Sequence, residues 1–74
     1  MPTYYGYKNW NHWNVALWIG NDEGLYHAAR YALRRHRSAR AAAAALLDEL
    51  PSHTPDGAPY TITSLIAALR GLES

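Results

Sequence analysis

The four histidines have the widest chemical range of any residues in this chain, because imidazole can bind a metal or move a proton near neutral pH. They stand at positions 12, 27, 36 and 53. No two of them have the four-residue spacing of a helical zinc motif, and the chain holds no cysteine. We therefore expect structural or solvated histidines and no metal site.

Nucleophiles and acids also lack a catalytic arrangement. The serines fall in predicted cap, loop or tail positions, without the glycine-bounded elbow that exposes a nucleophile. Asp48 and Glu49 are adjacent on a predicted helix and so point in different directions, which does not suit a shared acid–base task. We expect no enzymatic activity and no cofactor, and a function exerted by binding.

Arginines give the strongest surface signal. Residues 27–40 contain five arginines and no acidic residue. Helical spacing places Arg30, Arg34 and Arg37 on one face, and a planar guanidinium suits phosphates and carboxylates. Two interpretations remain open, namely contact with a partner and a solvated face whose charge compensates the helix C-terminus. The predicted partner-binding residues are Arg30, Tyr31, Arg34, Arg35, Arg37 and Arg40.

A second candidate patch is acidic. The formal net charge is only +1, which hides a basic middle and a mildly acidic second half. Such asymmetry bears on partners rather than on fold, and the low net charge argues against strong nonspecific binding of nucleic acid. An acidic patch can mimic phosphates in a DNA groove. Its predicted members are Asp22, Glu23, Asp48 and Glu49.

The elements that position these residues are predicted to be helices. In residues 9–20 the three tryptophans and Leu17 recur at helical spacing, which predicts a buried stripe with Trp10 its most exposed member and Asn14 left to water. Residues 21–37 form a second helix that turns His36 inward. Residues 38–50 form an alanine-rich third helix capped by Ser38, and 61–72 a fourth after a loop at 51–59.

The predicted fold class is all-α. We expect one domain over residues 1–74, a compact four-helix structure with an extended Tyr-rich N-terminal arm at 1–8. Hydrophobic residues make up 49% of the chain, which supports a core despite its short length. No apolar stretch approaches the roughly 20 residues of a membrane span, and no signal peptide is visible. We expect a cytoplasmic monomer that has no membrane contact.

The segment from Tyr5 to Tyr26 resembles a family of small orphan proteins encoded by phages, plasmids and other mobile elements. It reads YGYKNWNHWNVALWIGNDEGLY. The shared pattern is Gly-Tyr-x-Asn, then Trp-Asn-Val-Ala-Leu-Trp-Ile and an Asn-Asp-Glu turn, and the resemblance covers residues 4–32. The family commonly has Glu-Thr where this chain has Asn11-His12, which implies a different cap for the first helix.

Small Ala/Arg-rich members of this mobile-element group resemble anti-CRISPR proteins that act on type I CRISPR-Cas. The resemblance implies a steric inhibitor that binds the Cascade effector complex and blocks target DNA binding or cleavage in the bacterial host cytoplasm. The alternative is a small nucleic-acid-binding or regulatory module of a phage or mobile element. There the same arginines would bind phosphates, and the final helix after Thr61 would belong to a helix-turn-helix.

Overall fold

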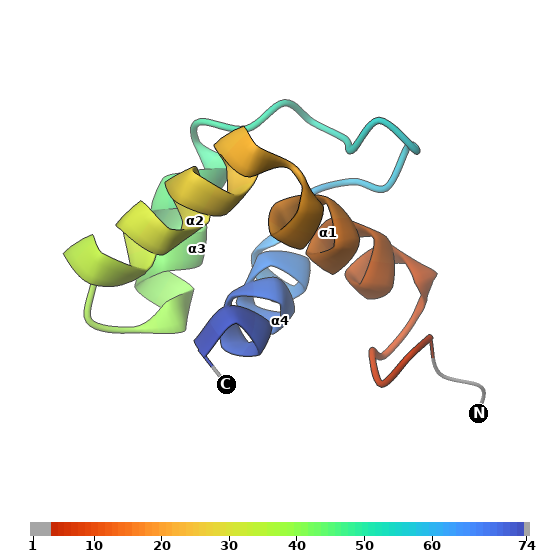
Figure 1. The fold of residues 1–74 in the computed structure, drawn as a ribbon, viewed down its shortest axis with the longest axis horizontal. Coiled ribbons are helices and arrows are strands. Elements are labelled where there is room, and N and C mark those ends of the chain that lie inside the picture. The colour runs from red at the N-terminus through yellow and green to blue at the C-terminus, as the bar shows by residue number, and fades with distance from the viewer. Residues whose placement is uncertain (1–3, 74) are drawn as a thin grey trace.

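The computed structural model describes residues 4–73 and folds them into four helices (Figure 1). They are α1 (Trp10–Asn21), α2 (Glu23–Arg35), α3 (Ala39–Leu47) and α4 (Ile62–Glu73). α2 and α3 form an antiparallel hairpin, α1 packs most extensively on α4, and the connection 48–61 arches over the molecule (Figure 1). The all-α prediction is confirmed. None of the described helices is long and apolar enough to cross a membrane.

Capping residues determine where each helix begins. At α4 the pairing is reciprocal, because Thr61 Oγ1 accepts from the Ser64 backbone N–H at 3.1 Å while Ser64 Oγ accepts from the Thr61 N–H at 3.0 Å. Each of the other three caps accepts a hydrogen bond from the backbone N–H three residues later. The caps are Asn9, Asp22, Ser38 and Thr61.

Two helices end earlier than their predicted bounds of 21–37 and 38–50. α2 ends at Arg35, because His36 takes an extended backbone, with φ −124° and ψ 147°, as the chain turns toward the Ser38 cap. His36 is exposed, so the prediction that it faces the core is wrong. α3 ends at Leu47, and the two acidic residues at 48 and 49 lie in the turn that follows it.

The N-terminal segment is Tyr-rich and largely exposed, but it is not extended as predicted, because its described part folds back on itself; residues 1–3 of the predicted arm lie outside the described residues. The backbones of Tyr4 and Tyr7 bond to each other at 2.8 and 3.1 Å. Between them Tyr5 and Gly6 have φ of 52° and 90°, as a type I′ turn requires. The Tyr5 ring is 82% exposed and lies 5.5 Å from the Trp13 ring, a contact that offsets part of the strain of a left-handed tyrosine.

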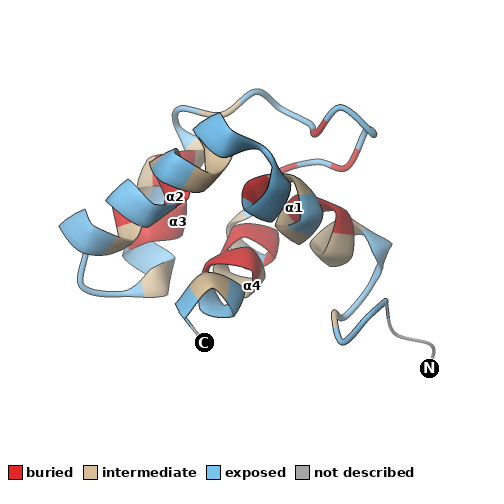
Figure 2. Cartoon of the chain, in the orientation of Figure 1, coloured by how far each residue is buried: buried red, intermediate tan, exposed pale blue. Residues whose placement is uncertain are grey.

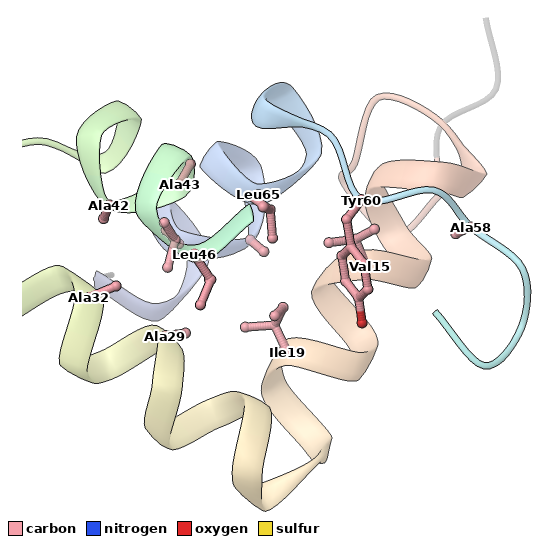
Figure 3. Packing of buried hydrophobic residues seen from close by; sticks show 12 residues of the cluster. Val15, Ile19, Ala29, Ala32, Ala42, Ala43, Leu46, Ala58, Tyr60 and Leu65 are labelled. Carbon is pink, nitrogen blue, oxygen red and sulfur yellow. The ribbon is translucent and has the colours of Figure 1, made fainter. Parts of the chain in front are cut away.

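The core combines mostly alanines on the α2–α3 hairpin, with Leu46 as its one large fully buried side chain, and mainly larger side chains on the other two helices (Figures 2 and 3). The buried hydrophobic residues of α2 are both alanines, and α3 adds two more, which lets helix backbones approach closely. The largest fully buried apolar side chains are Val15, Ile19, Leu46, Leu65 and Leu69. The loop 48–61 contributes Ala58 and Tyr60.

The buried side of α1 is not the predicted tryptophan stripe. Val15 and Ile19 are buried, whereas Leu17 is exposed and Trp13 and Trp18 are half-buried. Trp10 is 39% exposed, in agreement with its expected place as the most exposed tryptophan. α1 is apolar on most of its sides, so spacing alone does not determine which side turns inward. The compact core accepts Val and Ile and leaves the larger indoles at its edge.

Candidate binding surface

All six residues of the predicted partner-binding set are exposed. Arg30 Nη1 donates to the Leu72 carbonyl oxygen at 3.4 Å, and Arg35 Nη1 donates to the Tyr31 hydroxyl at 2.9 Å. Over residues 4–73, none of the contacts that these arginines make is with a carboxylate. Their positive charge is therefore not neutralised within the described chain.

The set divides between two sides of α2. On one side Tyr31 and Arg35 line a groove of about 170 Å³ between α2 and α3, which we call the Tyr31 groove. The guanidinium carbons of Arg34 and Arg35 lie 6.0 and 5.6 Å from the centre of the Tyr31 ring, within cation–π range. The lining residues are Ala28, Tyr31, Ala32, Arg35, His36, Ala45 and Glu49.

On the other side, Arg37 and Arg70 share a groove of about 430 Å³ between the α2–α3 turn and α4, which we call the Arg37–Arg70 groove. Its lining residues are Leu33, His36, Arg37, Ser38, Ala39, Arg70 and Glu73. Ser38 and Ala39 begin α3, so the positive end of that helix dipole lies at the groove. Arg70 was absent from the predicted set because it is far away in sequence. Arg40 lies in the first turn of α3 and lines neither groove.

The acidic set lies at the opposite end of the α2–α3 hairpin from the turn. Asp22 is the N-cap of α2, with its Oδ1 accepting from the Leu25 N–H at 2.9 Å, and Glu23 is in the first turn. Asp48 and Glu49 follow the end of α3, beside the start of α2 in the antiparallel hairpin (Figure 1). The predicted basic and acidic patches are thus the two ends of one hairpin.

A polar network that the sequence did not indicate fastens the loop 48–61 to α1. Asn14 Nδ2 and Trp18 Nε1 both donate to Asp56 Oδ2 at 2.9 Å. Thr54 Oγ1 donates to Asn14 Oδ1 at 2.6 Å, and the Ala58 N–H donates to Thr54 Oγ1 at 3.0 Å. Asn14 is 1% exposed, so the prediction that it meets water is wrong. These hydrogen bonds hold the loop in place against α1, although most of its residues are exposed.

Acid is expected to weaken this network. The hydrogen bonds from Asn14 and Trp18 hold the pKa of Asp56 below its ordinary value. A depressed folded-state pKa adds stability above the ordinary carboxyl pKa, and that stability is lost as pH falls through the folded value. We expect the wild-type melting temperature to fall between about pH 5 and pH 2 more steeply than that of Asp56→Asn.

Thermal unfolding followed by circular dichroism over that pH range tests this expectation. Asp48→Asn, at an exposed carboxylate for which the described structure gives no side-chain hydrogen bond, is the matched control and should keep the wild-type pH dependence. An Asp56→Asn variant with the same acid sensitivity as the wild type would show that the network is not its source.

The histidines lie apart from one another. Among the residues with described placement, no three His, Asp or Glu side chains gather closely enough to hold a metal ion. Ser52 Oγ and His53 Nδ1 are 2.8 Å apart, a contact between neighbours in an exposed loop. Burial, and then the charge of Lys8, lowers the pKa of His12.

The profile of DUF7249, a family of unknown function, matches residues 1–68. No curated protein and no solved structure matches the chain. The matched range contains the whole Tyr31 groove, whereas Arg70 and Glu73 of the Arg37–Arg70 groove lie beyond it.

Proposed function

The chain belongs to DUF7249, a family of unknown function, and we propose that this member is a steric inhibitor that binds a type I CRISPR effector complex through its basic surface. Bound there, it blocks target DNA binding or cleavage in the cytoplasm of a bacterial host. The choice of effector rests on the resemblance of the Tyr5–Tyr26 segment to mobile-element proteins. The mechanism needs only shape and charge.

One observation carries the proposal, which is that the arginines around the end of α2 are exposed and have no carboxylate contact within residues 4–73. Arginine is enriched in protein interfaces, where its planar guanidinium can donate two parallel hydrogen bonds to the two oxygens of one carboxylate. A surface with this much unneutralised charge gains most from an acidic partner.

The Arg37–Arg70 groove is the part of this surface best shaped to receive an acidic group. Two guanidinium groups from separate elements line it together with one carboxylate, that of Glu73, so its lining is basic on balance, and the positive end of the α3 dipole adds to the attraction for an anion. Arg30 lies toward α4 as well, with its guanidinium positioned by the Leu72 carbonyl. A carboxylate from the effector surface would therefore meet several donors in one place.

Binding to a purified type I effector tests the proposal. Arg37→Glu and Arg70→Glu, each made singly, are expected to weaken binding on the order of tenfold or more, because each turns an attraction into a repulsion. Lys8→Glu makes the same charge change at an exposed position before α1 and should bind as the wild type does. If the intact protein does not bind the effector, the effector is not its partner. If both arginine variants bind undiminished, the groove is not the contact.

A nucleic-acid module remains the second candidate, because a helix N-terminus beside two arginines also suits a phosphate. The form predicted for it is wrong in one respect. Residues 48–61 separate α3 from α4, which is far longer than the short turn of a helix-turn-helix. Affinity for naked DNA that falls steeply with salt would favour this candidate, whereas an effector inhibitor should leave naked DNA unbound.

A further inference from the structure

The α2–α3 hairpin separates its charges along its length. Its turn end is basic and its open end is acidic, and every one of these charged residues is exposed. The basic residues are Arg34, Arg35, Arg37 and Arg40, and the acidic ones are Asp22, Glu23, Asp48 and Glu49. Because the two helices are antiparallel, like charges from both helices meet at each end of the hairpin (Figure 1).

Helix stability explains the charges of α2 but not those of α3. A helix favours acids near its N-terminus and bases near its C-terminus, as α2 has with Glu23 in its first turn and Arg35 in its last. α3 shows the reverse, with Arg40 in its first turn and Asp48 and Glu49 after its last residue. Within one copy, the charges of α3 therefore interact unfavourably with its own dipole, and they repel the like charges of α2.

The Tyr31 groove joins the two charged ends. Alanines 28, 32 and 45 give it a small-residue floor, and Tyr31 stands beside it with its side chain 54% exposed. Arg35 lies toward the turn end of this groove and Glu49 toward the open end. Such a surface is complementary to a second copy of itself turned by 180°, because the positive end then faces the negative end and the two apolar centres meet.

We propose that two copies of this chain associate through the α2–α3 faces, with the two hairpins antiparallel about a twofold axis. Tyr31 of each copy packs over the alanine floor of the other, and Arg35 of each copy faces Glu49 of the other. The pairing removes the like-charge repulsion at both ends of each hairpin. It leaves Arg37 and Arg70, on the other side of α2, free for an acidic partner, and it does not depend on that partner's identity.

The size of the face sets the strength to expect. A 13-residue helix is about 20 Å long, so two such hairpins bury an area at the small end of stable interfaces. The dimer should therefore form reversibly with rising concentration in the micromolar to millimolar range. Added salt should weaken the dimer, because it screens the charge pairs at both ends of the contact.

Sedimentation of the full chain over that concentration range tests the proposal. Arg35→Glu and Glu49→Arg, each alone, place like charges opposite each other twice and should weaken self-association on the order of tenfold. An equimolar mixture of these two variants should associate at least as well as the wild type. In the mixture, every acidic position at this contact faces a basic one, and an interaction within one chain cannot reproduce this rescue.

Two further variants keep the outcome decisive. Tyr31→Ala should weaken association without unfolding the chain, because the Tyr31 side chain is largely exposed. Lys8→Glu, at an exposed position away from the contact, should change neither self-association nor folding. Circular dichroism confirms that each variant is folded, and if Arg35→Glu fails to fold, Glu49→Arg and Tyr31→Ala carry the test. A wild type that stays monomeric throughout, charge variants that associate as the wild type does, or a mixture that fails to associate would each overturn the proposal.

Discussion

Replacing Asn14 by alanine is expected to lower the free energy of unfolding by about 1–3 kcal/mol, because the buried Thr54 hydroxyl loses its acceptor and the Asp56 carboxylate loses one of its two donors. Asn14 accepts from the Thr54 hydroxyl and donates to the Asp56 carboxylate, and no other side chain of the described structure bonds to both. Thr54 is itself 4% exposed, so water cannot readily replace the lost acceptor. The loop 48–61 then loses a central attachment to α1.

Urea denaturation followed by circular dichroism measures this loss. Asn21→Ala makes the same substitution at the exposed last residue of the same helix and should change stability by less than about 0.5 kcal/mol. A double-mutant cycle with Asp56→Ala should show that the two substitutions are coupled, because each of them removes the same hydrogen bond, that between Asn14 and Asp56. Equal losses for Asn14→Ala and Asn21→Ala would contradict a structural role for the network.

Replacing Leu65 by alanine is expected to cost about 2–5 kcal/mol, the range for a buried leucine that leaves a cavity. Leu65 is fully buried in α4 and belongs to the same cluster as Val15 and Ile19 of α1 (Figure 3). A chain of this length has a total stability of only several kcal/mol, so the variant should be partly unfolded at 37 °C or close to it.

The matched control is Leu17→Ala, at a leucine of α1 that is 37% exposed. Its loss should be clearly smaller than that of Leu65→Ala, since less apolar surface returns to water. Urea midpoints of the two variants, compared at equal slopes, measure this difference, and helix propensity does not contribute to it because both variants replace leucine by alanine within a helix. If the two leucines contribute equally, α4 does not pack in the core as described.

Sequence was most informative about where helices begin. Asn9, Asp22, Ser38 and Thr61 are all residues whose side chains can bond a nearby backbone N–H, and each begins a helix in the structure. The signal is reliable because the donor and the acceptor are only three residues apart. The alanine run was equally clear, since alanine has the highest helix propensity.

Sequence was least informative where contacts join distant parts of the chain. Asn14 is polar and stands on a helix, which favours solvent, yet it is buried because Thr54 and Asp56 reach it from the far side of the sequence. The tryptophans misled the prediction of the buried side of α1 for a related reason. Their size marks them as apolar but does not say which side of a nearly all-apolar helix meets α4.

The candidate surface divides in the same way. The run of arginines was visible as a local pattern, and all of its members proved to be exposed. Arg70 was not visible, because it joins Arg37 only when α4 packs beside the α2–α3 turn. The sequence presented the basic and the acidic patch as alternatives. The structure places them at the two ends of the α2–α3 hairpin, an arrangement that could not be predicted without knowing how the two helices pack.

The packing of α1 on α4 affects how the protein can be made. The first helix of the chain finds its main support in a helix that begins only at Ile62. During translation α1 therefore stays without this support, and its Val15 and Ile19 side chains stay accessible, until α4 has left the ribosome. α1 should consequently reach its native packing only once α4 has emerged, and nascent chains stalled before α4 should be sensitive to proteases and bind chaperones.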